Sequence, residues 1–139
     1  MTWLVWALLS AVFAAATAIL AKIGVQDIDS NLATAVRTSV VVVFTWLFAS
    51  FTWESSAIAS ISSKTWIFLT LSGLATGLSW LCYFHALKLG PASRVAPIDK
   101  LSVALVIVFA ALFLGERLTP AKGIAGLLIV AGAIVIALD

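Results

Sequence analysis

Long apolar runs separated by short polar segments dominate the pattern of this chain. A membrane-spanning helix needs about 20 mostly apolar residues. Five runs of about that length are present: residues 2–21, 32–51, 66–87, 95–114 and 120–138. Because backbone groups in lipid must find hydrogen-bond partners within their own segment, we expect each run to be a helix that crosses a bilayer.

The composition agrees with this pattern. Hydrophobic residues make up 63% of the 139 residues and charged residues only 10%, whereas a soluble domain carries about 25% charged residues. So few charges cannot cover a surface that faces water. The predicted fold class is therefore an all-α integral membrane protein, a bundle of five transmembrane helices in a single domain over residues 1–139.

Several classes of function have no support in the sequence. The net charge is only +2, and no basic patch with interleaved aromatic residues indicates nucleic-acid binding. A single cysteine, Cys82, and a single histidine, His85, do not make a metal-binding cluster. No Gly-rich phosphate loop, nucleophile elbow or pair of catalytic carboxylates is present. The sequence thus predicts no enzyme, no cofactor and no metal site. The first run lacks a basic region before it, which favours a membrane helix over a signal peptide.

Lysine and glycine mark the ends of the first and third helices. Lys22 precedes Gly24, and Lys88 precedes Gly90. A cation near the C-terminus interacts favourably with the helix dipole, and a glycine is available for a left-handed cap.

The distribution of basic residues leaves the orientation open. An odd number of helices puts the two termini on opposite sides of the membrane. The N-terminal side then carries three basic residues and the opposite side three: Lys64, Arg117 and Lys122 against Lys22, Lys88 and Arg94. This balance gives the positive-inside rule no basis for choosing a side, although counting the deeper Arg37 and Lys100 gives five against three for the side opposite the N-terminus. The sequence thus permits insertion in both orientations without demanding it.

Four polar groups fall within or near the predicted spans. Charges inside a membrane helix are costly and usually mark function. Arg37, Asp99 and Lys100 follow the starts of the second and fourth helices, and His85 precedes the end of the third by one turn. All four lie at similar depths on the side opposite the N-terminus, which predicts one polar vestibule open to that side.

Pro97 refines the start of the fourth helix. Proline suits the first turn of a helix and disrupts its interior. We therefore expect this helix to start at Pro97, with residues 93–96 as irregular chain and Asp99 in the first turn. Interrupted helices of this sort often line transporter sites.

Structural explanations exist for each of these groups. Asp99 and Lys100 can lie at the headgroup level with Lys100 snorkelling to water. Arg37 can snorkel, cap a carbonyl or neutralise Asp99 in a purely structural ion pair. His85 can be a packing residue.

The third predicted helix carries a row of hydroxyl groups. Ser72, Thr76, Ser79 and Tyr83 are spaced four, three and four, with Trp80 and His85 beside them. Such a face suits a route for a small amphipathic molecule. It is equally compatible with hydroxyls that bond their own helix backbone.

Several of these segments resemble EamA-type transporters. Residues 90–102 (GPASRVAPIDKLS) resemble the start of the fourth helix of that family, and residues 113–118 (FLGERL) resemble the loop that follows it. Residues 126–137 are similar to its fifth helix and residues 35–38 to its Arg-bearing second helix.

The resemblance implies the drug/metabolite transporter superfamily. Its larger members have ten helices in two inverted five-helix repeats, and they carry metabolites, amino acids or drugs across the inner membrane of bacteria and archaea. This chain is similar to the short members with one repeat. A five-helix repeat joined to its own copy must be inverted, so a homodimer of the same form must be antiparallel.

The function expected from this resemblance is secondary transport, in the export direction, of a small metabolite or drug-like molecule across the cytoplasmic membrane. A homodimer would work by alternating access. The expected substrate-binding residues are Arg37, Ser79, Trp80, Tyr83, Asp99 and Lys100, with Asp99 or His85 available for proton coupling. Two other functions stay open: a subunit of a lipid-linked sugar flippase, and a non-transporting membrane assembly protein in which Arg37 and Asp99 pair solely with each other.

Overall fold

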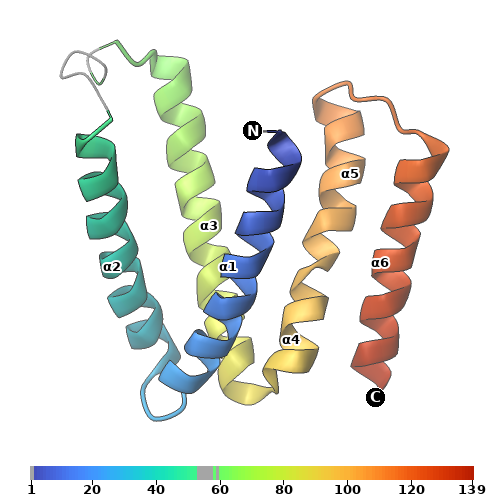
Figure 1. Cartoon of the computed structure of the whole chain (residues 1–139), viewed down its shortest axis with the longest axis horizontal. Helices are drawn as coiled ribbons and strands as arrows, with labels where there is room; N and C mark the ends of the chain where they lie inside the picture. Colours follow the sequence, from blue (N-terminus) through green and yellow to red (C-terminus); the bar gives the residue numbers. More distant parts are fainter. Residues whose placement is uncertain (1, 53–57, 59) are drawn as a thin grey trace. The chain divides into compact units, whose positions relative to one another are not determined.

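Helices account for nearly all of the structure. A computed structural model describes residues 2–52, 58 and 60–139. The described residues form helical segments and no strand (Figure 1). Their bounds are α1 Trp3–Gly24, α2 Ser30–Ser50, α3 Ser63–Leu89, α4 Ala92–Asp99, α5 Leu101–Phe113 and α6 Pro120–Leu138. Because α4 and α5 together make one span, Ala92–Phe113, the helices provide five candidate membrane spans. The predicted all-α membrane fold is confirmed.

Caps set the starts of α2 and α3 a few residues before the apolar runs. The side chain of Asp29 accepts hydrogen bonds from the backbone N–H groups of Asn31 (2.9 Å) and Leu32 (3.1 Å). Ser62 accepts in the same way from the N–H of Thr65 at 3.2 Å. Such side chains satisfy the free N–H groups of a first helical turn, so both helices begin in the polar segment that precedes the run.

The prediction for the fourth helix was wrong in detail. Residues 93–96 are helical, because α4 begins at Ala92, and Pro97 lies inside that helix. The interruption comes later, at Lys100, whose N–H donates to the carbonyl of Pro97 at 3.1 Å. Proline lacks an N–H and its ring crowds the preceding turn, but Pro97 is only the sixth residue of α4 and is accommodated there, and the helix ends two residues after it. Asp99 consequently ends α4 and does not lie in a first turn.

The predicted left-handed glycine caps of α1 and α3 were also wrong. Among the described residues, only Gly115 has a positive φ, at 67°. Gly115 follows Leu114, the C-cap residue of α5, and the N–H of the next residue, Glu116, donates to the carbonyl of Ala110 at 3.2 Å. The left-handed cap is therefore found at the FLGERL segment.

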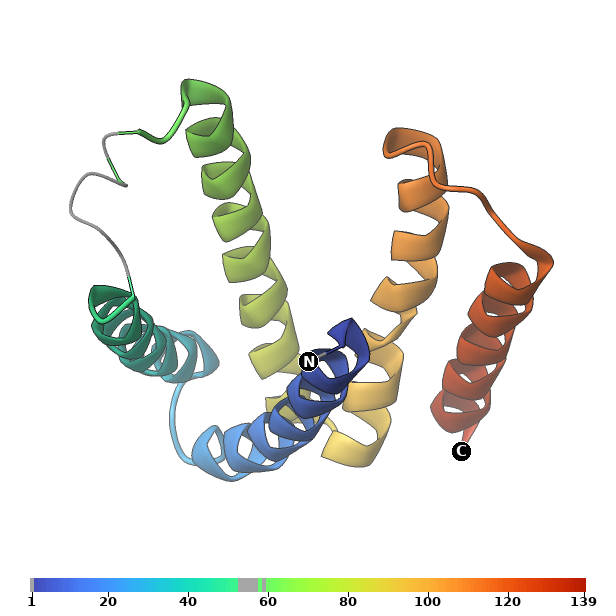
Figure 2. The same cartoon turned by 45° about the horizontal axis from the view of Figure 1, so that its top comes forward.

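The contacts divide the chain into two units, which are described separately. One comprises residues 1–20 and 89–139, and the other residues 21–88. In the first, α5 and α6 run antiparallel and lie side by side, and α4 packs against α6 (Figures 1 and 2). The approach is close at Gly126, where an added Cβ would lie 3.7 Å from Cδ1 of Ile107.

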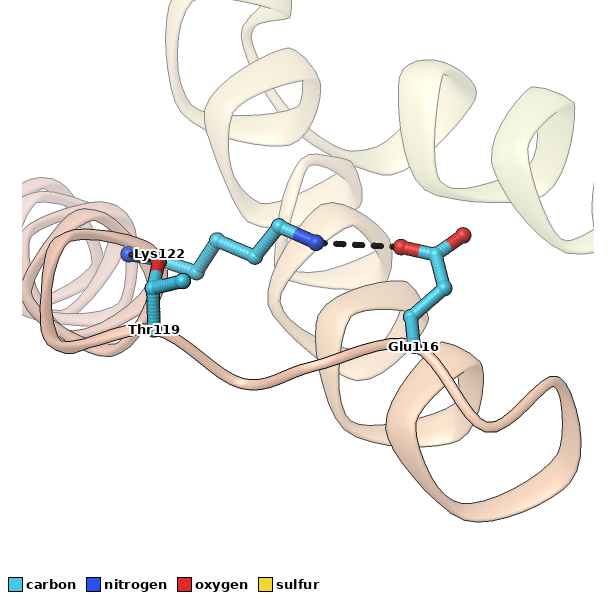
Figure 3. Close-up of polar contacts among 3 residues, drawn as sticks. All are labelled: Glu116, Thr119 and Lys122. Carbon is cyan, nitrogen blue, oxygen red and sulfur yellow. Dashed lines mark hydrogen bonds and ion pairs between the residues drawn. The ribbon is translucent and has the colours of Figure 1, made fainter.

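The connection between α5 and α6 carries its own polar contacts (Figure 3). Thr119 caps α6 by accepting a hydrogen bond from the N–H of Lys122 at 3.3 Å. The ammonium group of Lys122 also pairs with the carboxylate of Glu116 at 3.1 Å. Pro120 occupies the first position of α6, where its missing N–H is no loss.

In the unit of residues 21–88, α2 and α3 come together at one end. They approach each other near the start of α2 and the end of α3, and they diverge toward the segment that joins them (Figure 2). Val25 and Leu87 are fully buried, and Phe84 is only 3% exposed. Most large apolar side chains elsewhere are exposed, as expected for helices whose outer surfaces face lipid tails.

Candidate functional site

Arg37 lies over aromatic rings of the facing helix. It is on α2, and its guanidinium carbon is 4.2 Å from the centroid of the Trp80 ring and 5.6 Å from that of Phe84. Both distances are within about 6 Å, the range in which a cation is attracted to the face of an aromatic ring. We call Arg37, Trp80 and Phe84 the Arg37 cluster.

Sequence spacing explains how α3 presents both rings together. Trp80 and Phe84 are four residues apart, which places them on the same face of a helix. Phe84 is buried and Trp80 is half-buried. The Nη1 atom of Arg37 is buried as well, and it has no hydrogen-bond partner among the described residues of its unit. The rings of the cluster thus cover the flat face of the Arg37 guanidinium group, and an N–H donor at its edge, on Nη1, is not hydrogen-bonded within the described part of the unit.

The hydroxyl groups along α3 do not all have the same surroundings. The hydroxyl of Thr76 donates to the carbonyl of Ser72 at 2.9 Å, so this group bonds its own helix. Ser79 is exposed, and Tyr83 is half-buried with its ring edge-on to that of Phe84 at 6.5 Å between centroids. Thr76 supports the structural alternative, and the roles of Ser79 and Tyr83 in a binding wall stay predictions.

A second polar group of side chains lies where α1 and α3 end and α2 begins. The ammonium group of Lys22 donates to the carbonyl of Leu87 at 2.6 Å, and that of Lys88 donates to the carbonyl of Ile28 at 2.5 Å. Each lysine thereby supplies a donor to a carbonyl outside its own helix. The lysines expected at the C-terminal ends of α1 and α3 are found there, and their ammonium groups bond these carbonyls.

His85 joins the same end of the unit. Its Nδ1 atom lies 3.3 Å from the hydroxyl oxygen of Ser30, the first residue of α2. The exposed histidine ring therefore connects the end of α3 to the start of α2. A role in proton coupling stays a prediction.

Asp99 and Lys100 belong to the other unit and contact each other. The ammonium group of Lys100 is 3.2 Å from Oδ2 of Asp99, and the side chains are 56% and 35% exposed. Partly exposed pairs of this kind contribute little to stability. The predicted ion pair between Arg37 and Asp99 stays a prediction.

Sequence reasoning missed Phe84 and Ser30. The spacing of Phe84 from Trp80 was a usable signal, because a residue four positions away shares the face that meets Arg37. Ser30 follows Asp29, and a helix start at this pair is recognisable from the preference of Asp for the N-cap. The partnership of Ser30 with His85 depends on tertiary placement and leaves no mark in the sequence.

The groups of the Arg37 cluster are suited to binding a ligand. Guanidinium N–H groups donate hydrogen bonds, and the rings offer apolar surface to a ligand. In the described ranges, no group of three or more His, Cys, Asp or Glu side chains is placed to hold a metal ion.

Comparisons with known proteins identify the family. The profile of the EamA-like transporter family matches residues 1–138. A protein of Sinorhizobium sp named "Uncharacterized transporter in cobO 3'region" is 50% identical over 136 residues, which are 98% of this chain and 96% of that protein. The "Uncharacterized transporter YxxF" of Bacillus subtilis (strain 168) is 30% identical over 115 residues, which are 82% of this chain and 35% of that protein.

No solved structure matches the chain significantly. The family profile covers all five candidate spans, including the GPASRVAPIDKLS and FLGERL segments on which the resemblance was based. The chain is therefore a member of the EamA-like transporter family, a multi-pass membrane protein whose sequence resemblance to that family is confirmed.

Proposed function

We propose that this protein is a secondary transporter that exports a small metabolite or drug-like molecule across the cytoplasmic membrane and works as a homodimer. The observation that carries the proposal is an odd number of spans in a transporter family. The family profile covers five candidate spans and residues 1–138. The YxxF relative aligns over only 35% of its length, which leaves room there for a second repeat.

An antiparallel arrangement of the two subunits follows from helix parity. Transporter sites often lie between inverted repeats, and a repeat with an odd number of helices is inverted when it is followed by a copy of itself. A homodimer reproduces that relation only if its subunits insert in opposite orientations. The Lys and Arg residues in or beside the polar segments number three on each side, which weakens the bias that normally fixes one orientation.

Two of the proposed substrate-binding residues, Arg37 and Asp99, occupy equivalent positions along their helices. Arg37 is the eighth residue of α2 and Asp99 the eighth of the span Ala92–Phe113, so each is about 10 Å from the start of its helix at 1.5 Å per residue. By parity both helices start on the same side of the membrane. The residues assigned to substrate binding are Arg37, Ser79, Trp80, Tyr83, Asp99 and Lys100, with Asp99 or His85 assigned to proton coupling.

Orientation mapping tests the dimer. In a Cys82→Ala variant, a single cysteine is placed at Asp139 or at Ser62, and intact cells are treated with a membrane-impermeant thiol reagent before and after permeabilisation. Dual orientation predicts that each site is labelled by about half in intact cells. Labelling of one site completely and of the other not at all would contradict the antiparallel dimer.

Efflux measurements test transport itself. Cells that express the wild-type protein or the Arg37→Gln variant are loaded with amino acids, organic acids and dyes in turn, and the loss of each compound is followed. We expect faster loss of at least one compound with the wild-type protein only. If Asp99→Asn retains full pH-driven flux of that compound, Asp99 does not carry the coupling proton.

A further inference from the structure

Arg37 has no carboxylate partner among the described residues of its own unit. The acidic residues of the described part of this unit are Asp27 and Asp29. Asp29 is used as the cap of α2, where its side chain accepts two backbone N–H groups. Within the described part of residues 21–88, neither Asp27 nor Asp29 forms an ion pair with Arg37. The charge of Arg37 is therefore not neutralised there, although it lies within a candidate membrane span.

The rings stabilise the face of the guanidinium group and leave its edge unsatisfied. An aromatic ring attracts a cation that lies over its face, and Trp80 takes this position at 4.2 Å. The five N–H donors of a guanidinium group lie in its plane and point away from such a ring. One of the atoms that carry them, Nη1, is buried without a hydrogen-bond partner in this unit. A buried charged donor without an acceptor is costly, so the site favours an acceptor from outside the unit.

The chemistry of this acceptor follows from the donor. A carboxylate or phosphate group accepts two parallel hydrogen bonds from one guanidinium edge, and it supplies the negative charge that the cluster lacks. A neutral carbonyl supplies only the hydrogen bonds, and an amine supplies neither.

We propose that the edge of Arg37 binds an oxyanion, carboxylate or phosphate, of an anionic substrate, and that Trp80 is a positioning residue that fixes the plane of the guanidinium group. This inference rests on the proposed function, because it names the substrate class of the same site. The apolar part of the substrate lies against the aromatic rings. Cationic amphipathic compounds are excluded from the site.

Fluorescence of Trp80 provides a direct test of binding. The other tryptophans are replaced by phenylalanine, and the protein is reconstituted in vesicles of zwitterionic phosphatidylcholine. Benzoate and phenyl phosphate serve as anionic probes, benzamide as the neutral probe of the same shape as benzoate, and benzamidine as the cationic one. We expect a saturable change in Trp80 emission with at least one anion and none at the same concentrations with benzamide or benzamidine.

Matched variants separate the role of Arg37 from the stability of the fold. Arg37→Gln should weaken binding of the anion by about ten- to a hundredfold, the loss of one charge-assisted hydrogen bond. Arg37→Lys, which keeps the charge and loses the planar fork, should give an intermediate loss. Arg94→Gln, at an exposed arginine paired with Asp139 in the other unit, should bind as the wild type does. Circular dichroism confirms that each variant retains its helices.

Four results would overturn the proposal. Equal binding of benzoate and benzamide, or an Arg37→Gln variant that binds benzoate as the wild type does, would remove the oxyanion site. Benzoate binding that appears only in an Asp99→Asn variant would show that Asp99 is the partner of Arg37. Loss of benzoate binding on addition of phosphatidylglycerol would assign the site to a lipid phosphate in place of a soluble substrate. Binding needs neither transport nor dual orientation, so one-sided cysteine labelling with intact benzoate binding would contradict the antiparallel homodimer alone, and absence of efflux with intact benzoate binding would contradict the transport function alone.

Discussion

Among the described residues, three basic side chains of one unit of this molecule pair with carboxylates, whereas Lys88 and Arg37 of the other contact a carbonyl group and aromatic rings. In the unit of residues 1–20 and 89–139, the described ion pairs are Arg94–Asp139 at 3.6 Å, Lys100–Asp99 at 3.2 Å and Lys122–Glu116 at 3.1 Å. In the unit of residues 21–88, Lys88 donates to a backbone carbonyl and Arg37 stacks on Trp80 and Phe84.

The difference follows from where the charges lie along the helices. The paired charges of the first unit are at helix ends, at the break between α4 and α5 or in the α5–α6 connection. Arg37 is inside α2, where an ion costs about 2.5–3.5 kcal/mol near the centre of a bilayer. Aromatic rings offset part of this cost without cancelling the charge, and this remaining charge is the basis of the anion site proposed at Arg37.

The largest expected effect contrasts one phenylalanine from each unit. Phe84 is 3% exposed and Phe109, on α5, is 50% exposed. Phe84→Ala opens a cavity beside Trp80 and Arg37 and should lower the free energy of unfolding by about 3 kcal/mol or more. Phe109→Ala should lower it by less than about 1 kcal/mol, because lipid replaces the lost contacts. Unfolding of the detergent-solubilised protein by dodecyl sulfate, followed by circular dichroism, measures both.

Similar losses in the two variants would mean that the burial of Phe84 is not what distinguishes the units. The Arg37 cluster would then be a loose surface contact. Its rings would not hold the guanidinium group in one orientation, and the comparison would fail at its central point.

The spans were predictable from sequence because lipid imposes a strong condition on any segment that crosses it. About 20 apolar residues in a row have few other interpretations, and each predicted run lies largely within a helix. The interruption of the fourth span was misplaced, because Pro97 does not end a helix at its own position. The helix runs on to Asp99 before it breaks at Lys100.

The site was less predictable because its partners come from different helices. Arg37 was recognisable as a charge inside an apolar run, and Trp80 as a tryptophan far from a helix end. Their stacking depends on how α2 and α3 meet, which hydropathy does not encode. The glycine caps show the same limit: Gly24 and Gly90 had the expected sequence context, and Gly115 has the left-handed backbone.

A double-mutant cycle should isolate the attraction between Arg37 and Trp80. Trp80→Leu keeps an apolar side chain and removes the ring face, and Arg37→Met removes the charge. The coupling free energy from the two single variants and the double variant should be about 1–2 kcal/mol. The same cycle with Trp66→Leu, a ring 50% exposed at the far end of α3, should give a coupling near zero. A coupling near zero for Trp80 as well would remove the basis for its positioning role.

A glycine pair tests the cap in the other unit. Gly115 has a φ of 67°, whereas Gly123 is inside α6 without a positive φ, and an added Cβ would meet nothing within 4 Å at either position. Gly115→Ala should therefore cost about 1 kcal/mol through backbone strain alone. Gly123→Ala should be neutral or stabilise by up to about 1 kcal/mol, because alanine is the better helix former. Equal effects in dodecyl sulfate unfolding would show that the backbone at Gly115 does not need the left-handed conformation.

The smallest effect is expected at the ion pair between Glu116 and Lys122. The two side chains are 53% and 45% exposed, and such pairs contribute about 0.5 kcal/mol or less, because water and salt screen them. Glu116→Gln should therefore change the unfolding free energy only slightly, and the difference from the wild type should vanish in 1 M salt, where the screening length is about 3 Å. A loss above about 1.5 kcal/mol that persists in salt would place this pair in a low-dielectric environment. Lys122, paired with a carboxylate, and Arg37, stacked on aromatic rings, would then both lie in a low-dielectric environment. The two cations would differ only in the kind of partner that they contact.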